Sequence, residues 1–210
     1  MKVLAINGSP RPKGNTYHAI RAAADALEEA GISCEILHVG HKAVHGCIAC
    51  QKCHEMRNER CAIDDEVNDW IQHMKAADGI ILASPVYYTG IAGTMKAVCD
   101  RAFYVSGANG NFFRLKPGAA LVAVRRSGGV ATFDQLNHYF TISEMPVVSS
   151  CYWNAIHGLE PGEALGDGEG LNVARTVGVN MAWLLKLIEH GRGTLPTPAA
   201  PPGVRTNFIR

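Results

Sequence analysis

The sequence has no long hydrophobic run and no excess of charge of either sign. Its most apolar segments, Gly79–Ala83 and Ala119–Val124, are only as long as a strand and cannot span a bilayer. The apolar stretch at the N-terminus is too short for a signal peptide, because Gly, Ser and Pro follow it directly. Lys and Arg number 20 against 19 Asp and Glu, so no basic surface for nucleic acid or membrane is indicated. We therefore expect a cytoplasmic protein that binds neither nucleic acid nor membranes.

The composition also excludes a disordered chain and a disulfide framework. Hydrophobic residues make up 47% of the chain and charged residues 19%, as in ordinary globular proteins. The 210 residues are enough for one domain with a substantial core. Seven cysteines are an odd number, and the cytoplasm keeps thiols reduced. These cysteines are therefore expected to be free, catalytic or metal-binding.

Apolar strands alternate with helical patterns along the chain. We predict strands at Lys2–Ile6, Cys34–Val39, Gly79–Ala83, Gly118–Val124 and Pro146–Ser150. Helices are predicted near residues 16–30, 65–74, 93–104, 132–143 and 171–190. This alternation predicts an α/β fold: a flavodoxin-like, doubly wound, five-stranded parallel sheet in the order 2-1-3-4-5, with helices on both faces. Residues 1–190 are predicted to form this domain, and the proline-rich tail, 191–210, to pack on it or on a neighbouring subunit.

The loop after the first strand, NGSPRPKGNT, contains neither G-x-G-x-x-G nor G-x-x-x-x-G-K-[ST]. It still has the groups that bind phosphate: Gly8 and Gly14 for close backbone approach, hydroxyl and amide donors, and the charge of Arg11. A tight turn that caps the following helix is the alternative. The segment G-S-P-R-x-x-G-N-T resembles the phosphate loop of the NAD(P)H-dependent FMN reductase branch of the flavodoxin-like superfamily. The resemblance implies that this loop binds FMN through Ser9, Arg11, Lys13, Gly14, Asn15 and Thr16.

The loop after the third strand, SPVYYTGIAGTMKAVCDR, is similar to a second segment of the same family. Its tyrosines offer aromatic surface for a flavin ring, although tyrosines at strand ends also serve in cores and interfaces. After the fourth strand, RRSGGVATF is a further glycine-rich loop, with Arg125 or Arg126 suited to nicotinamide phosphates or simply to solvent. The resemblance implies that the flavin contacts Pro85, Val86, Tyr87, Tyr88 and Gly90 and, on its far side, Ser127, Gly128 and Gly129.

Four cysteines gather in the segment 46–62, in the pattern C-x2-C-x2-C-x7-C: Cys47, Cys50, Cys53 and Cys61. A structural zinc site usually joins two separated pairs, whereas three closely spaced cysteines are typical of iron–sulfur ligation. Zinc, redox-active thiols and structural thiols remain alternatives. The segment resembles the cysteine motif of the iron–sulfur flavoprotein family, and YWNAIHG, VGVNMAWLLK and TNFIR also look typical of it. The resemblance implies that the four cysteines are the ligands of a [4Fe–4S] cluster.

These resemblances imply an FMN-dependent oxidoreductase. It would pass electrons between NAD(P)H, or a ferredoxin-like partner, and a small acceptor such as a quinone, a flavin or an oxygen species. A [4Fe–4S] cluster would take part, and the family suggests a homodimer or homotetramer. The alternative is a flavodoxin-type electron carrier without turnover of its own. Because carriers generally steer their partners with a strong field, a net charge of +1 speaks against that alternative.

Overall fold

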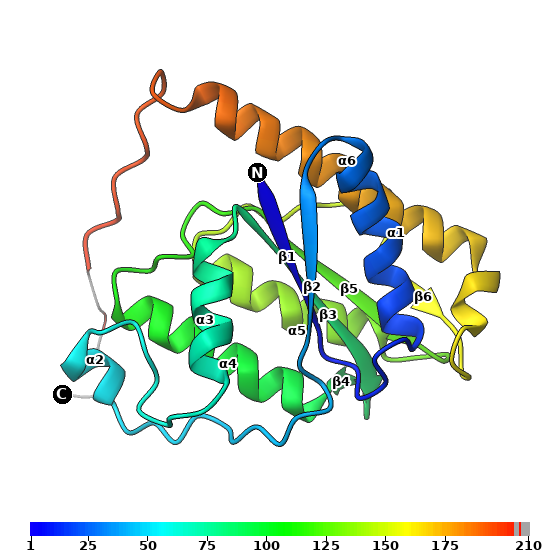
Figure 1. Ribbon diagram of the computed structural model, residues 1–210, viewed down its shortest axis with the longest axis horizontal. Helices are drawn as coiled ribbons and strands as arrows, with labels where there is room; N and C mark the ends of the chain where they lie inside the picture. Colours follow the sequence, from blue (N-terminus) through cyan, green and yellow to red (C-terminus); the bar gives the residue numbers. More distant parts are fainter. Residues whose placement is uncertain (204–205, 207–210) are drawn as a thin grey trace.

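The computed structural model describes residues 1–203 and 206. At its centre lie five parallel strands in the order β2-β1-β3-β5-β6 (Figure 1). Their bounds are β1 Lys2–Asn7, β2 Ser33–His38, β3 Gly79–Tyr87, β5 Gly118–Val124 and β6 Ala155–His157. A two-residue strand, β4 (Gly90–Ile91), turns back antiparallel on the end of β3. When β4 is left out and the other five strands are numbered as they occur in the chain, their order across the sheet is 2-1-3-4-5. This order confirms the predicted flavodoxin-like sheet.

Helices cover both faces of the sheet (Figure 1). Alternate residues of β1 explain this: Leu4 and Ile6 belong to the core beneath one helical layer, and Val3 and Ala5 to the core beneath the other. The first layer holds α3 (Val67–Ala76), α4 (Gly93–Ala108) and α5 (Gly129–Ile142); the second holds α1 (Asn15–Glu29) and α6 (Gly168–Gly191). A Cβ at Gly178 of α6 would lie 2.1 Å from the Ala23 carbonyl oxygen, so the close approach of α6 to α1 requires glycine there.

The predicted fifth strand, Pro146–Ser150, is wrong in its position. Only Val147 bridges to Gly118, and the chain then leaves the sheet before it returns as β6. The buried side chain of Asn154 explains the interruption, because its Nδ2 donates to the carbonyl oxygen of Ala120 in β5, 2.9 Å away. A side chain thus takes an acceptor that a continuous strand would pair with its own N–H. The break between Val147 and Ala155 also creates a turn beside the carboxyl end of the sheet.

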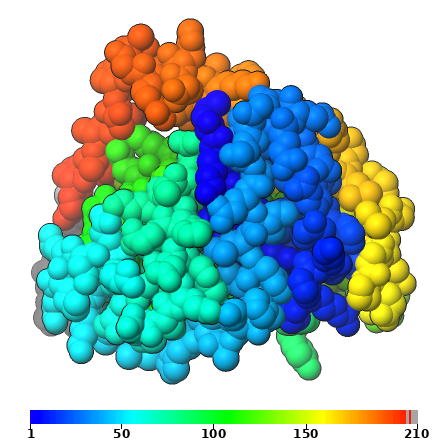
Figure 2. Space-filling view, in the orientation of Figure 1, coloured from blue at the N-terminus to red at the C-terminus, as the bar shows by residue number. Residues whose placement is uncertain are grey.

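The segment between β2 and α3 is long and mostly irregular. It contains the short helix α2 (Lys52–Met56) and forms the outer surface beside α3 and α4 (Figures 1 and 2). In Figure 2 this cyan segment lies on a different part of the surface from the deep-blue N-terminal loop. The two candidate centres are therefore separated on the molecule.

After α6 the chain passes back across the molecule toward α2 (Figure 1). The Arg114 guanidinium donates to the carbonyl oxygens of Pro198 and Ala199, at 2.8 and 3.1 Å. Except for Thr206, the closing TNFIR lies outside the described residues. A 3-10 turn, η1 (Glu163–Gly166), precedes α6. In the described part of the chain, no helix is both long and apolar enough to cross a membrane.

Candidate functional site

The loop between β1 and α1 is braced by its own side chains. The Asn7 carboxamide accepts a hydrogen bond from the Ser9 N–H at 3.1 Å and donates one to the Pro12 carbonyl oxygen at 3.2 Å. The Ser9 hydroxyl accepts one from the Arg11 N–H, also at 3.2 Å. These bonds shape the loop before any ligand is bound.

The end of β2 braces the same loop from the side. A Cβ at Gly40 would lie 2.2 Å from the Ser9 carbonyl oxygen, so only glycine fits between the two chains. His38 Nε2 lies 2.7 Å from that same oxygen and must be the donor, because a carbonyl only accepts. The ring of His38 is in turn stacked on His41, with the centroids 4.4 Å apart.

A cavity of about 240 Å³ opens at the carboxyl ends of β1, β3 and β5. Most of the FMN residues predicted in the loops after β1 and β3 line this cavity, but Lys13, Tyr88 and Gly90 do not. The sequence interpretation missed Gly158 and Leu159, which follow β6 and close one side. The predicted residues that line it are Ser9, Arg11, Gly14, Asn15, Thr16, Pro85, Val86 and Tyr87, and Arg125 joins them.

The wall of this cavity formed by α1 has unused hydrogen-bonding groups. Thr16 Oγ1 is buried and has no partner among the described residues. Helix α1 begins without a side-chain cap, and the N–H groups of Asn15 and Thr16 have no hydrogen-bond partner among the described residues. A helix N-terminus attracts anions, and Arg11 and Arg125 add positive charge at the same cavity. This arrangement fits a phosphate group.

Asn15 lines the cavity, and its side chain is also hydrogen-bonded to the loop before α6. Its side-chain oxygen accepts from the N–H groups of Gly162 and Ala164, at 3.0 and 3.3 Å, and its Nδ2 donates to the Glu160 carbonyl oxygen at 3.0 Å. The carboxamide therefore fixes the loop before α6 against the start of α1. Its part in the cavity is to hold Gly158 and Leu159 in place.

The hairpin of β3 and β4 projects beside the cavity. Its two turn residues, Tyr88 and Thr89, have φ of 48° and 59°, and the Tyr88 side chain is fully exposed to solvent. A Cβ at Gly90 would lie 3.2 Å from the Gln135 side chain, and one at Gly128 would lie 2.9 Å from Thr89 Cα. These two glycines thus allow the hairpin to rest against the start of α5.

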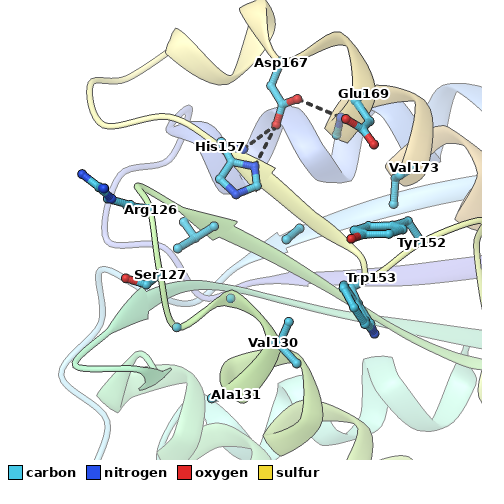
Figure 3. A pocket seen from close by; sticks show the side chains of 15 residues that line it. Arg126, Ser127, Val130, Ala131, Tyr152, Trp153, His157, Asp167, Glu169 and Val173 are labelled. Carbon is cyan, nitrogen blue, oxygen red and sulfur yellow. Dashed lines mark hydrogen bonds and ion pairs between the residues drawn. The ribbon is translucent and has the colours of Figure 1, made fainter.

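A second cavity, of about 570 Å³, lies on the other side of the loop after β5 (Figure 3). Two consecutive residues of that loop line different cavities: Arg125 lines the first cavity and Arg126 lines the second. The predicted flavin residues Ser127, Gly128 and Gly129 line the second cavity, opposite the half-exposed rings of Tyr152 and Trp153. The YWNAIHG segment indicated these aromatic residues, but nothing in its spacing showed where they lie.

His157 and Asp167 form the polar end of the second cavity (Figure 3). The Asp167 carboxylate accepts from the His157 N–H at 2.7 Å and from the Gly170 N–H at 2.9 Å, and His157 Nδ1 lies 3.2 Å away. Burial raises the pKa of Asp167, but the N–H donors of Gly170 and His157 outweigh it, so the pKa lies below its ordinary value. Asp167 thus stays ionised and caps α6.

The cysteine loop, residues 46–62, forms a third centre. Its four cysteines line one small cavity of about 20 Å³, and all are free thiols. Cys47 and Cys50 are exposed, whereas burial of Cys53 raises the pKa of its thiol. Among the described residues, no three His, Cys, Asp or Glu side chains are grouped to hold a metal ion. A single zinc ion would need its sulfur ligands about 4 Å from one another.

The backbone of the cysteine loop is unusual. Nine described residues other than glycine have positive φ, and four of them lie in this loop. They are Ala49, Gln51, Arg57 and Glu59. Each costs on the order of 1–3 kcal/mol and persists where the surroundings enforce it, which is common at functional sites. The loop is therefore held in a specific curved shape.

Two buried side chains hold Cys61 in that loop. Arg101 of α4 is 1% exposed, and its Nε donates to the Cys61 sulfur at 3.4 Å. Asn68 of α3 accepts from the Cys61 N–H at 2.7 Å and donates to its carbonyl oxygen at 3.2 Å. Arg101 ends the family segment quoted above, but the sequence alone did not connect it with the cysteines.

Comparisons with known proteins show the family and the fold of this chain. The family model described as NADPH-dependent FMN reductase matches residues 1–160. An iron–sulfur flavoprotein of Methanocaldococcus jannaschii is 38% identical over 196 residues, which are 90% of this chain and 100% of that protein. The crystal structure of RosB with a bound intermediate has a TM-score of 0.73 at 16% identity, and the match covers 100% of this chain and 94% of that one. A flavodoxin from the domain Archaea has a TM-score of 0.59 at 17% identity, over 89% and 99% of the two chains. At these identities the structures show the flavodoxin-like fold alone.

Proposed function

The chain belongs to the NADPH-dependent FMN reductase family, and from this premise we propose that it is an FMN-dependent oxidoreductase. It takes electrons from NAD(P)H or from a ferredoxin-like donor. It passes them to a small acceptor such as a quinone, a flavin or an oxygen species. The observation that carries this proposal is the buried, unpartnered hydroxyl of Thr16 at the uncapped start of α1, in a cavity with two arginines.

In this proposal the first cavity holds FMN. The N-terminus of α1, Ser9, Arg11 and Thr16 would bind its phosphate, and Tyr87, Arg125 and Ser127 would contact its flavin ring. FMN supplies hydride and single-electron chemistry when bound. The residues around it bind and orient the cofactor, and none is required as an acid or base for hydride transfer.

We place the nicotinamide co-substrate in the second cavity. Arg125 and Arg126 are consecutive residues and line the first and the second cavity, so the two cavities are neighbours along the loop after β5. The rings of Tyr152 and Trp153 offer apolar surface, and Arg126 offers a charge for a phosphate. Replacement of Arg126 by alanine is expected to raise KM for the nicotinamide and to leave kcat unchanged. The same change at the exposed Arg192 serves as the control and should alter neither constant.

We further propose that the cysteine loop holds a [4Fe–4S] cluster through Cys47, Cys50, Cys53 and Cys61. Two observations support it. The four cysteines line one cavity. Similar proteins of Methanocaldococcus jannaschii and Methanosarcina thermophila are also named iron–sulfur flavoproteins. Thiolate is the usual protein ligand of such clusters, so the donor set fits this group.

The test is anaerobic rapid mixing of the FMN-loaded protein with NADH and with NADPH, followed by turnover with a quinone. The proposal predicts bleaching of the flavin absorbance by at least one nicotinamide or by a reduced ferredoxin, and many turnovers per protein. Flavin that stays oxidised with all three donors would overturn it. Reduction without repeated turnover would instead identify a flavodoxin-type carrier.

A further inference from the structure

Arg101 is the most completely buried cation of the described chain, and acceptors surround its guanidinium. Its two terminal nitrogens each lie 2.7 Å from an oxygen of the Asp65 carboxylate. They also donate to the carbonyl oxygens of His45 and Ile63, at 3.4 and 3.1 Å. The remaining Nε–H is directed at the Cys61 sulfur, 3.4 Å away. The two Asp65 carboxylate oxygens and the two carbonyl oxygens therefore set the position of the guanidinium, and the Cys61 sulfur is its fifth partner.

No other cysteine of the loop receives a hydrogen bond from a side-chain cation in the described residues. Lys52 and Arg60 are near neighbours of cysteines in the sequence, but both are exposed to solvent. The high dielectric constant of water and dissolved salt weaken the effect of a charge in solvent, whereas they weaken that of a buried charge in contact with sulfur much less. Cys61 thus differs from Cys47, Cys50 and Cys53 in its electrostatic surroundings.

We propose that Arg101 is a positioning residue that raises the reduction potential of the cluster through Cys61. This inference rests on the cluster proposed above. Reduction adds one electron to the cluster and its sulfur ligands, and no bond is formed or broken. The added negative charge strengthens the bond from Arg101 Nε to the Cys61 sulfur, so the reduced form is stabilised more than the oxidised form.

Asp65 acts in the opposite direction. Its carboxylate neutralises much of the guanidinium charge, and the guanidinium holds the pKa of Asp65 below its ordinary value, so the pair stays ionised. Loss of Asp65 leaves the cation at Cys61 without its counter-ion and should raise the potential. Loss of Arg101 removes the hydrogen-bond donor to the Cys61 sulfur and leaves the negative Asp65 carboxylate, so it should lower the reduction potential. A residue that only stabilised the fold would not produce shifts of opposite sign.

The experiment is an anaerobic redox titration of the iron-loaded protein, with the cluster followed by electron paramagnetic resonance and FMN by absorbance. For Arg101→Gln we expect at least a tenfold less favourable one-electron reduction of the cluster, which is about 59 mV. For Asp65→Asn we expect a smaller shift to higher potential, because the Asp65 side chain is 32% exposed and solvent screens it. The FMN potential should not move in either variant.

Arg60→Gln is the matched control, because it removes the same charge one residue from Cys61 but in solvent. It should change the equilibrium constant for one-electron reduction of the cluster by less than threefold relative to the wild type. If Arg101→Gln does not retain iron, Asp65→Asn decides alone, since it keeps the Nε donor in place. An unchanged or lower potential in Asp65→Asn would then overturn the inference.

The two proposals fail in different ways. Wild-type protein without iron would overturn the cluster and this inference together. Wild-type protein with iron, and with equal cluster potentials in all variants, would overturn only the role of Arg101. A downward shift in both Arg101→Gln and Asp65→Asn would show that the pair merely holds the loop together.

Discussion

The phosphate-loop cavity and the cysteine loop, in which we propose that FMN and an iron–sulfur cluster are bound, are formed in different ways. The first is formed by regular elements: strand ends, the start of α1 and a short loop that hydrogen-bonds to itself. The second is an irregular excursion with four left-handed residues, and helices α3 and α4 hold it through Asn68 and Arg101. A binding site at a sheet edge thus follows from topology, whereas the cysteine loop depends on a few buried polar side chains.

The largest expected effect is loss of the cluster while FMN is kept. Cys50→Ala removes one of the four ligands and should abolish iron and acid-labile sulfide binding under anaerobic conditions, because no other described thiol lines that cavity. FMN content should stay at the wild-type level, since the flavin cavity is formed by different elements. Iron, sulfide and flavin assays on purified protein measure this. The exposed Cys151, changed to alanine, is the control, and loss of FMN in Cys50→Ala would show that the two regions are coupled.

The next effect is confined to the first cavity, the phosphate-loop cavity in which we propose that FMN binds. Thr16→Val keeps the shape of the side chain but removes the buried hydroxyl that has no protein partner. Loss of a hydrogen bond to a charged phosphate should weaken FMN binding about tenfold or more. Fluorescence titration of the cofactor-free protein with FMN measures the dissociation constant. Thr141→Val, whose hydroxyl bonds to the His138 carbonyl oxygen within α5, should bind as the wild type does; unchanged binding by Thr16→Val would contradict our placement of the phosphate.

A smaller effect concerns the second cavity. Asp167→Ala removes the cap of α6 and the acceptor for two backbone N–H groups, and should lower the free energy of unfolding by about 1–2 kcal/mol. Because the pKa of Asp167 is depressed, this contribution is complete above the ordinary value of 3.8 and is lost as the pH falls below it. Urea unfolding at neutral and acidic pH measures the difference, which should shrink in acid. The exposed Asp134, changed to alanine, should show no such difference, and a gap that widened in acid would contradict the sign.

The smallest effect is expected at the ion pair of Arg175 and Glu29, which joins α6 to α1. Both side chains are largely exposed, so solvent and salt screen their attraction. Arg175→Gln should leave the thermal unfolding midpoint unchanged within error. A clear drop in that midpoint would show that surface charges, and not the packing at Gly178, hold the two helices together.

The sheet and the position of the loop after the first strand were predictable from the sequence because they depend on local patterns. Apolar runs gave the strands, and the glycines with Ser9 and Thr16 marked the loop at the correct strand end. The fifth strand was misplaced, since its position depends on Asn154, whose side chain reaches a carbonyl 34 residues away in the chain. Contacts of that range leave no periodicity to read.

The bracing of the cysteine loop was hidden for the same reason. Arg101 lies 40 residues after Cys61, and its partner Asp65 lies 36 residues before it in the chain. Likewise, Arg125 and Arg126 are neighbours in the sequence, but the loop after β5 places them in two different cavities. The residue types indicated these sites, but only the fold shows which residues contact one another.

The central claim is that one chain holds two redox groups, FMN at the sheet edge and a cluster in the cysteine loop. The most direct test is the wild-type protein purified without oxygen, with iron and sulfide assayed per FMN. Our account predicts about four irons and four sulfides for each flavin. A full complement of FMN with no iron would contradict it and would leave an FMN reductase whose cysteine loop carries only free thiols.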